Sequence, residues 1–404
     1  MNSKKILYII GGNITTAPRA LKSIISLHPK YDLAIAFINK SNLWIKFDKE
    51  FLKETNIPYK NTSLLRQDFI QWSKATSIHE IAKSIYPFFK NSLTINAYAS
   101  NKGMISLQYG LRKIKNNFDL IIAHTYPAIY PAYKFAKKHN IPFIFDVEDY
   151  HPGEKCSPKE KMRREFLMKK ILPQAAFFTY ASPMIGEYTL KLIGQYPTDK
   201  HALINNSFPQ KEFTFKQNDS EKIKFVWFSQ NISQGRGLEL VLPALHKYKH
   251  KIEFHLIGNL YTDFYNNFLK KYADFIVIHK PLPQKELNLK LAEFDVGLAL
   301  EISNVDINKQ IAVSNKIWAY FQSGLYILAT DTPAQVKFLS EHKNTGLIAQ
   351  QNTEDFNLKI RQIINNIDQI REEKKQRYEY AQKFSWEKEA EKLLKIVHNI
   401  LESK

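Results

Sequence analysis

The chain has 404 residues, of which 44% are hydrophobic and 13% aromatic, and its formal net charge is +19. This apolar content is sufficient for two to three domains with buried cores, and it excludes an intrinsically disordered chain. The charge indicates an acidic partner, such as nucleic acid, an anionic membrane surface or a phosphorylated small molecule. A proteome that is generally rich in lysine would explain it equally well.

The cysteine content and the apolar runs bear on location. A single cysteine, Cys156, excludes an internal disulfide framework and fits a reducing compartment, so we expect a cytoplasmic protein. The basic and apolar start, MNSKKILYII, is followed at once by Gly11 and Gly12, which predicts a first β-strand instead of a signal peptide. No apolar run is long enough to cross a bilayer, so any membrane association should be peripheral.

The first half of the chain alternates strand-like and helix-like segments. The predicted elements are a strand at 5–10, a helix at 18–27, strands at 32–38 and 118–124, a helix at about 131–138 and a strand at 141–149. Residues 51–113 show helical patches without clear caps, and we expect only helices and loops there. Alternation of this kind predicts βαβ units and a parallel sheet.

A polar stretch that begins at Asn205 interrupts the pattern and is the best candidate for a linker. The alternation then restarts, and apolar spacing predicts two amphipathic helices at the end, over 356–370 and 386–400. The sequence therefore predicts two similar α/β halves. The expected divisions are an N-terminal domain at 1–205, a linker at 206–222, a C-terminal domain at 223–382 and a final helix at 383–404 that packs back on the N-terminal domain.

Residues 314–330, SNKIWAYFQSGLYILAT, have the pattern of a polar cap, a short helix, a glycine stop and a buried strand. We expect Ser314 to cap the helix, and the free N–H groups, the helix dipole and Lys316 to form a place for a phosphate group without a metal. Gly324 is expected to end the helix. Capped helix N-termini are common, so an ordinary structural role is the alternative.

Small and polar residues follow the predicted strands of the first half. Gly11, Gly12 and Asn13 come after the first strand, where a missing side chain lets the backbone approach a diphosphate or an acceptor. A plain tight turn is the alternative. His124 ends a later strand, and four polar residues, Asp146, Glu148, Asp149 and His151, lie at the end of the next. Ligands bind at the carboxyl ends of strands in open α/β sheets.

The two halves, the linker, the segment around Lys316 and the terminal FSWEKEAEKLLKIV together resemble the GT-B glycosyltransferases, specifically glycosyltransferase family 4. The likeness covers nearly the whole chain. Its motifs occur in the order expected for the family: SQNISQGRG at 229–237, HLIGN at 255–259, DVGLAL at 295–300, NKIWAY at 315–320 and GLYILAT at 324–330. The resemblance implies two Rossmann-like domains whose parallel sheets face each other across a cleft, with C-terminal helices that close the chain.

The resemblance also implies an activity. Such enzymes transfer a hexose-like sugar from a nucleotide-diphosphate sugar, of UDP or GDP type, to a glycan or lipid-linked acceptor, with retention at the anomeric carbon and without a metal or other cofactor. The donor binds mostly to the C-terminal half and the acceptor to the N-terminal half. The implied setting is synthesis of a bacterial surface polysaccharide, lipopolysaccharide or capsule at the inner face of the plasma membrane, with peripheral contact to anionic lipid and no nucleic acid.

The resemblance places donor-binding residues in the C-terminal half. Arg236 stands where the family has a phosphate-binding lysine, and Gln230 stands where it has a companion arginine. Cations there would stabilise the charge that develops on the leaving diphosphate. The candidate donor-binding residues are Gln230, Arg236, Gly237, Gly258, Glu301, Asn308, Asn315 and Lys316.

The chain departs from the family at its Glu-x7-Glu motif, whose second glutamate holds the ribose of the donor. Ile311 and Ala319 occupy the two positions, and neither side chain can accept a hydrogen bond. Glu301 and Asn308, on a loop that is longer than usual, are the expected substitutes, with a solvated loop carboxylate as the alternative.

The resemblance makes Glu148, Asp149, His151 and His124 the catalytic candidates. Glu148 or Asp149 stands where the family often has a histidine near the sugar, and His151 lies slightly beyond. A carboxylate there could orient sugar hydroxyls or stabilise positive charge on the sugar ring. Capping of the next helix is the alternative role.

Other readings remain. Residues 155–170 are rich in basic side chains with Phe166, Leu167 and Met168 among them, which indicates a helix that lies on an anionic leaflet or simply a solvated face.

A catalytically silent GT-B protein that binds a partner or a glycan is the main alternative function. A nucleotide-sugar epimerase is disfavoured because its N-terminal glycine-threonine-arginine signature is missing, and no nucleic-acid-binding motif is present.

Overall fold

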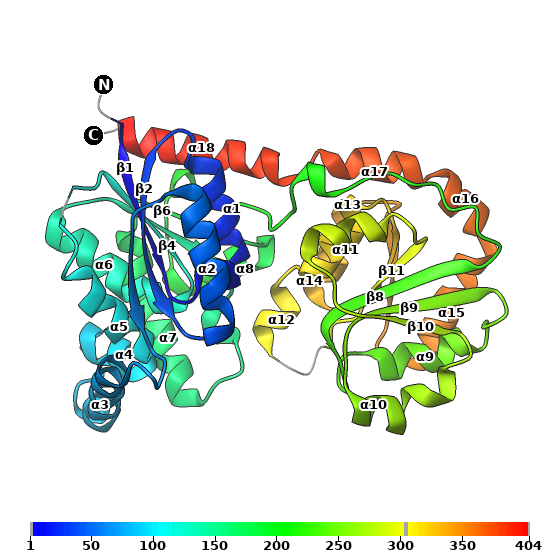
Figure 1. The fold of residues 1–404 in the computed structure, drawn as a ribbon, viewed down its shortest axis with the longest axis horizontal. Helices are drawn as coiled ribbons and strands as arrows, with labels where there is room; N and C mark the ends of the chain where they lie inside the picture. Colours follow the sequence, from blue (N-terminus) through cyan, green and yellow to red (C-terminus); the bar gives the residue numbers. More distant parts are fainter. Residues whose placement is uncertain (1–2, 116, 303–305, 403–404) are drawn as a thin grey trace. The chain divides into compact units, whose positions relative to one another are not determined.

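The computed structural model describes residues 3–115, 117–302 and 306–402. The chain divides into two compact units (Figure 1). Unit 1 contains the chain up to Ile204 together with the segment from Ala390 onward, and unit 2 is Asn205–Glu389. The boundary falls where the polar stretch begins, and the end of the last helix belongs to unit 1.

Unit 1 is built on a seven-stranded parallel sheet with the order β3-β2-β1-β4-β5-β6-β7. The strands are β1 Lys5–Ile10, β2 Asp32–Asn39, β3 Tyr59–Ser63, β4 Leu120–His124, β5 Phe143–Val147, β6 Phe177–Tyr180 and β7 His201–Leu203. The strand order reverses between β1 and β4, so their carboxyl ends flank the place where open α/β sheets bind ligands. The expectation of helices and loops alone at 51–113 is wrong for β3, because this edge strand, YKNTS, is short and polar and shows no apolar alternation.

The sequence predicts bounds for two helices of unit 1, at 18–27 and about 131–138, and the structure has a helix at each place. The helices of unit 1 are α1 Pro18–Leu27, α2 Asn42–Thr55, α3 Phe69–Ile85, α4 Leu93–Ser100, α5 Lys102–Leu111, α6 Ile129–His139, α7 Pro158–Ile171 and α8 Pro183–Ile193. Three of them start with proline, whose fixed φ suits the first turn. Asn140 stops α6 in the left-handed region, at φ 53°.

Unit 2 has a six-stranded parallel sheet with the order β10-β9-β8-β11-β12-β13. The strands are β8 Ile223–Ile232, β9 Ile252–Leu260, β10 Ile276–His279, β11 Val296–Ala299, β12 Tyr326–Thr330 and β13 Gly346–Ala349. Here the order reverses between β8 and β11. Successive residues of β8 enter different cores, since Phe225 and Trp227 pack in one apolar cluster and Val226 in another. Both faces of the sheet are therefore covered, as expected for parallel strands.

The helices of unit 2 complete the two α/β layers. They are α9 Leu238–His246, α10 Thr262–Asn267, α11 Gln284–Leu291, α12 Ile307–Ile311, α13 Asn315–Gln322, α14 Pro333–Glu341, α15 Thr353–Asn365, α16 Ile367–Glu372, α17 Lys374–Gln382 and the start of α18 Trp386–Glu402. The single helix predicted over 356–370 is wrong, because Asn366 leaves the helical region at φ −113° and ψ 18° and divides it. Gly324 ends the segment after α13 at φ 71°, as predicted.

The predicted linker is held on unit 2 by buried contacts. The Phe208 N–H donates to Gln322 Oε1 at 2.8 Å, and Gln322 Nε2 donates to the Phe208 carbonyl at 2.9 Å. Asn218 donates to the buried carboxylate of Asp295. The stretch looks polar in sequence, yet its backbone is fixed by side chains from distant parts of unit 2. Among the helices of the described chain, none combines the length and the apolar character that crossing a membrane requires.

Candidate functional site

In unit 2, the loop after β8 lies against the end of β11. Gly237 precedes α9 with φ 85°, a conformation that L side chains rarely adopt. A Cβ at Gly237 would also lie 2.8 Å from Leu300 Cβ, so the close approach of the two segments requires glycine. Arg236, the preceding residue, is exposed, and the described residues provide it with no ion pair. This packing places the arginine at the carboxyl edge of the sheet, near the end of β11.

Lys316 and Glu301 form an ion pair at the same edge. Lys316 Nζ lies 3.1 Å from Glu301 Oε1, and the side chains are only 16% and 20% exposed. The backbone of Glu301 is fixed by Thr330, whose hydroxyl accepts from the Glu301 N–H at 2.9 Å and donates to the Glu301 carbonyl at 2.7 Å. A lysine in the first turn of α13 is opposed by the helix dipole, and Glu301 supplies the compensating anion.

The start of α13 differs from expectation in one respect. Ser314 is the N-cap residue, but its side chain accepts no capping hydrogen bond, and its Oγ is buried without a partner among the described residues. The capping role predicted for Ser314 is therefore wrong. Asn315 Oδ1 accepts from Asn206 Nδ2 at 2.8 Å, so that candidate is engaged within unit 2. The N–H groups of the first turn remain free of a side-chain cap.

Two donor candidates have structural roles. Gly258 is required because a Cβ there would lie 2.2 Å from the Ser229 carbonyl oxygen, between β9 and the end of β8. Gln230 is exposed, and its backbone carbonyl accepts from Asn259 Nδ2 at 2.9 Å. Asn308 is buried on α12. Part of the loop predicted to be long, residues 303–305, lies outside the described residues.

The side chains that occupy the two motif glutamate positions point into the interior of unit 2. Ile311 is 1% exposed and Ala319 is 0% exposed. Both side chains belong to the packed interior of unit 2, so they cannot contact a ligand. A carboxylate that holds a ribose must come from elsewhere, and Glu301 is the one beside Lys316.

In unit 1, the glycine loop follows β1 and is hydrogen-bonded to the end of β4. The Gly11 N–H donates to the His124 carbonyl and to Thr125 Oγ1, and a Cβ at Gly11 would lie 2.4 Å from that hydroxyl. Gly12 is buried, and Lys40 is its nearest cationic neighbour. Asn13 is buried too, and its amide oxygen accepts from two backbone N–H groups, of Lys40 and the following serine. The Asn13 side chain is therefore engaged within unit 1, which leaves the backbone of the loop as the part that a ligand could approach.

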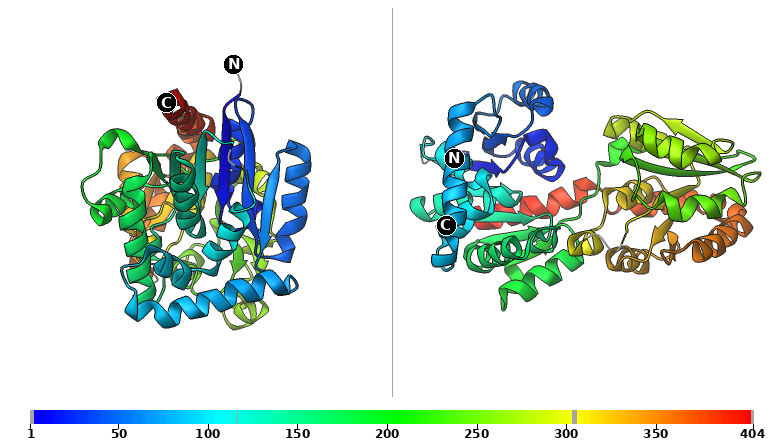
Figure 2. Two further views of the ribbon diagram at one scale, coloured as in Figure 1. Left: turned by 90° about the vertical axis from the view of Figure 1, so that its left-hand side faces the viewer. Right: turned by 90° about the horizontal axis from the view of Figure 1, so that it is seen from below.

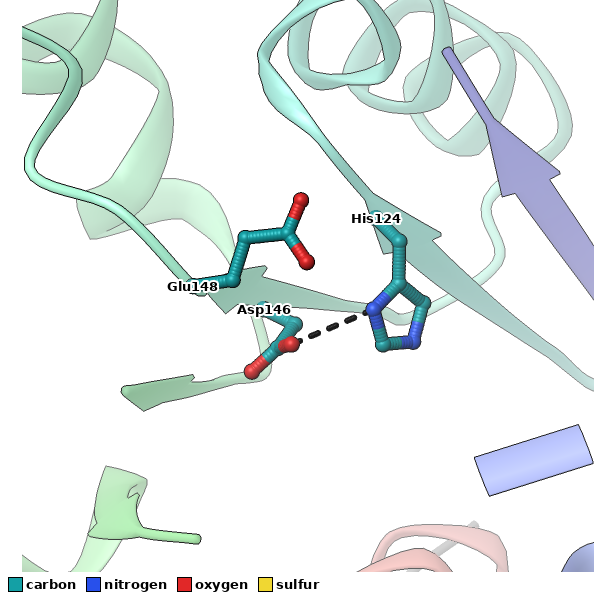
Figure 3. A group of neighbouring side chains, drawn as sticks. All are labelled: His124, Asp146 and Glu148. Carbon is teal, nitrogen blue, oxygen red and sulfur yellow. Dashed lines mark ion pairs between the residues drawn. The ribbon is translucent and has the colours of Figure 1, made fainter. Parts of the chain in front are cut away.

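A buried ion pair lies below the catalytic candidates. Arg19 on α1 donates to both carboxylate oxygens of Asp146 at 2.7 and 2.8 Å, and Thr179 donates to the same carboxylate. His124 Nδ1 lies 3.1 Å from Asp146 Oδ2, and its Nε2 has no hydrogen-bond partner among the described residues (Figure 3). Burial alone would raise the pKa of Asp146, but the charge and hydrogen bonds of Arg19, with His124, hold it far below its usual range.

Glu148 completes this cluster. One ligand atom from each of His124, Asp146 and Glu148 lies within 4.8 Å of the others, and Figure 3 shows the three side chains grouped at the ends of β4 and β5. Burial, followed by the charges of Asp146 and Asp149, raises the pKa of Glu148 to about 8. Arg19 already pairs with Asp146, and the raised pKa of Glu148 lets this carboxyl carry a proton near neutral pH and act as a hydrogen-bond donor.

His151 is fixed in a network on α7. Its Nδ1 lies 2.9 Å from Glu154 Oε1, its ring packs on Tyr126 at 5.1 Å between centroids, and its Nε2 has no partner among the described residues. Arg164 pairs with both Glu154 and Glu160. The orientation of the His151 ring is therefore set, and its second ring nitrogen is buried without a partner among the described residues.

The apolar side chains of the basic segment over 155–170 are divided between the interior and the surface. Leu167 and Met168 are fully buried, and Arg163 is buried beside Glu160. Met162, at 54% exposed, is the large apolar side chain that α7 presents among its lysines. Contact with an anionic leaflet and a solvated face therefore both stay predictions for this segment.

Sequence reasoning missed two residues of unit 1, Arg19 and Lys40. Arg19 interrupts the apolar face of α1, as does Ser23, and both are buried. A cation on an apolar helix face is a signal for a buried carboxylate partner, which here is Asp146. Lys40 follows β2 and lies beside the glycine loop, but a lone lysine in so lysine-rich a chain gives no sequence signal.

Solved structures share this architecture. No protein-family model and no curated protein sequence matches the chain. A glycosyltransferase from Rickettsia africae is similar over 100% of both chains, with 15% identity and a TM-score of 0.64. HepE of Anabaena in complex with UDP is similar over 98% of this chain and 100% of its own, with 13% identity and a TM-score of 0.62. A UDP-GlcNAc 2-epimerase from Neisseria meningitidis bound to UDP-GlcNAc is similar over 98% of this chain and 100% of its own, with 12% identity and a TM-score of 0.59.

These identities bear on the fold alone, because one fold hosts different reactions. The two parallel-sheet α/β units, each with helices on both faces, and the long helices at the end of the chain match the architecture of these structures. The predicted fold class is confirmed: the chain has the GT-B fold.

Proposed function

We propose that this protein transfers a sugar from a nucleotide-diphosphate sugar to a glycan or lipid-linked acceptor. The observation that carries the proposal is the arrangement at the carboxyl edge of the unit 2 sheet. The Arg236 loop packs on the end of β11, and Lys316 is paired with Glu301 just beyond it. Two cations and the starts of α9 and α13 are thus gathered at one edge, where a diphosphate would bind.

In the proposed reaction, the bond between the anomeric carbon and the diphosphate oxygen breaks, and its electron pair goes to the diphosphate. Arg236, Lys316 and the free N–H groups of α13 stabilise that charge, so no metal or further cofactor is needed. Glu301 accepts a hydrogen bond from a ribose hydroxyl. The donor is of UDP or GDP type; UDP is bound in the solved structure of HepE, which supports the first.

The acceptor and the sugar are proposed to meet the candidates of unit 1. Glu148 would donate its proton in a hydrogen bond to a sugar oxygen, since its pKa is about 8. His124 and His151 each have a buried Nε2 without a partner among the described residues, and we propose that substrate binding brings a hydroxyl to these two nitrogens. We propose that the transfer retains the configuration at the anomeric carbon. The proposed setting is the synthesis of a bacterial surface polysaccharide, lipopolysaccharide or capsule, with peripheral membrane contact at the inner leaflet.

The test begins with binding. Thermal shift and calorimetry with UDP and GDP, in the presence of EDTA, should show stabilisation by one of them. Incubation with a panel of nucleotide sugars should then release the nucleotide, and NMR of the product gives the anomeric configuration. A nucleotide sugar converted to its C2 epimer would identify an epimerase instead.

A catalytically silent GT-B protein is the second candidate, because Ile311 and Ala319 replace both motif glutamates. It predicts no binding of nucleotide and no release from any nucleotide sugar. If the wild type binds UDP and Arg236→Ala does not, the transferase is favoured.

A further inference from the structure

The large apolar side chains that face solvent are concentrated in one part of unit 1. Among the described residues, the five most exposed large hydrophobic side chains all lie between Leu43 and Phe89. They are Phe88 at 82%, Leu43 and Ile70 at 80%, Phe69 at 66% and Ile81 at 59%. Scattered apolar residues are normal on a protein surface, but a concentration of this kind marks an interaction surface.

Helices α2 and α3 carry this surface together with the 3-10 turn Tyr86–Phe88 that follows α3, and the first turns of the two helices lie together. Asn42 Nδ2 at the start of α2 donates to Gln67 Oε1 at 3.1 Å, just before α3. Leu43 and Phe69 therefore flank the same junction. Farther along α3, Ile70 and Ile81 are three helical turns apart and lie on one face. The left view of Figure 2 shows α3 extended across one end of unit 1.

A basic pocket adjoins the apolar residues. It has a volume of about 340 Å³ and lies between β3, α3 and α5, and Ile70 is part of its lining. Lys60, Lys74 and Lys113 also line it, whereas no acidic residue does. Lys74 Nζ lies 4.4 Å from the centroid of the Tyr109 ring. An acidic group with an apolar chain attached would satisfy both the pocket and the patch.

We propose that the α2–α3 surface of unit 1 docks on a bilayer that contains anionic lipid. The apolar side chains enter the headgroup and upper acyl region, and the pocket lysines bind lipid phosphates. Phe69 and Phe88 are aromatic side chains of the kind found on the apolar face of helices that lie in a membrane interface. Charge decides against a second copy as the occupant, because two chains of net charge +19 would bring like charges together.

This inference deepens the proposed function by naming the surface through which a lipid-linked acceptor is reached, and it relies on that function only for this purpose. Vesicle binding and nucleotide binding are separate measurements on separate units. Loss of one leaves the other intact, so failure of the docking proposal is distinguishable from failure of the transferase proposal.

The first experiment tests the apolar part with the full chain. Sedimentation is compared on vesicles of phosphatidylcholine alone and of phosphatidylcholine mixed with phosphatidylglycerol in equal parts. The wild type should partition onto the mixed vesicles, and the variant Leu43→Ser/Ile70→Ser/Phe88→Ser should bind at least about tenfold more weakly. Val336→Ser/Leu358→Ser, at exposed apolar positions of unit 2, is the matched control and should bind like the wild type.

The second experiment tests the charged part. Lys60→Gln/Lys74→Gln/Lys113→Gln should also lose about tenfold or more of its binding to the mixed vesicles, because each lysine near an anionic surface contributes about 1 kcal/mol. The charge-matched control removes three lysines from the α7 segment: Lys155→Gln, Lys159→Gln and Lys161→Gln.

Three results would overturn the proposal. The wild type could ignore the mixed vesicles, the α7 control could lose binding while the α2–α3 variants keep it, or ultracentrifugation could show a dimer that Ile70→Ser dissociates. All substituted side chains are exposed, so the variants should keep the thermal midpoint of the wild type, which circular dichroism checks. Inorganic phosphate added to the mixed vesicles should not release the protein if the lipid surface is the partner.

Discussion

Lys316 Nζ lies 3.1 Å from Glu301 Oε1, so two residues that the sequence nominates for the same ligand form an ion pair with each other. Under the proposed function, a diphosphate, which carries more charge than one carboxylate, would draw Lys316 away from Glu301. The carboxylate would then accept a hydrogen bond from a hydroxyl of the nucleotide. The pair would thereby couple recognition of the phosphates to recognition of the ribose.

This link predicts opposite effects for two ligands in Glu301→Gln. Inorganic pyrophosphate should bind more tightly than to the wild type, because a competing negative charge beside Lys316 is gone. UDP should bind about 10- to 100-fold more weakly, since the ribose loses a charged hydrogen-bond acceptor, whose contribution is about 1.5 to 3 kcal/mol. Calorimetry with both ligands measures the two effects. Equal shifts for both, or unchanged UDP affinity and turnover, would remove Glu301 from the site.

Arg236→Ala should weaken UDP binding by about 10- to 100-fold, the loss of one or two charge-assisted hydrogen bonds. Because Arg236 is exposed, the thermal midpoint without ligand should not change. Lys247→Ala provides the matched control, as it removes an exposed cation at the other end of α9. If both variants bind UDP equally well, the phosphate-binding role is ruled out.

Arg19→Met should destabilise unit 1 by about 3 to 5 kcal/mol, because it leaves the buried Asp146 carboxylate without its partner. The double variant Arg19→Met/Asp146→Leu should recover much of this loss, since no unpaired charge remains. Urea denaturation followed by circular dichroism gives both values. Additive losses in the double variant would show that the ion pair is not the origin of the effect.

Glu148→Gln should stabilise the folded chain at neutral and mildly basic pH. The wild-type carboxyl keeps its proton in the folded state until about pH 8, whereas its ordinary pKa is 4.5. The unfolded state thus binds fewer protons between these values, and stability falls as pH rises through this window. The amide cannot ionise, so the variant should gain roughly 1 to 3 kcal/mol near the upper end of the window.

The measurement is thermal unfolding of both proteins across the same pH range, with Glu187→Gln as a control on the same unit. The difference in stability between Glu148→Gln and the wild type should vanish in acid, where the Glu148 carboxyl is neutral in both the folded and the unfolded state. A constant difference at every pH would show that Glu148 ionises normally.

His151→Ala and Asp149→Asn should lower kcat far more than they change the affinity for UDP, because the donor phosphates are assigned to unit 2. Steady-state kinetics and calorimetry on the same preparations separate the two quantities. Parallel losses in turnover and UDP binding would contradict the assignment of these residues to the sugar.

Local signals in the sequence were enough for much of the fold. The strands β1, β2, β8 and β9 are apolar runs next to clear turns, and their positions follow from periodicity alone. Strand β3 has no such run, and the break at Asn366 lies inside an uninterrupted apolar spacing. Periodicity reports burial of a face, so it misses a polar edge strand and continues across a local kink.

The candidate site divides in the same way. By itself, the sequence determined the two α/β halves and identified the residues at the strand ends, because apolar spacing and glycines act over a few neighbouring residues. Only the tertiary structure decided which of those residues are buried and which pair with one another. Asn13 and Ser314 turned inward, Lys316 met Glu301, and Arg19 met Asp146 across 127 positions. Such pairings depend on how strands order themselves in the sheet, which no local pattern encodes.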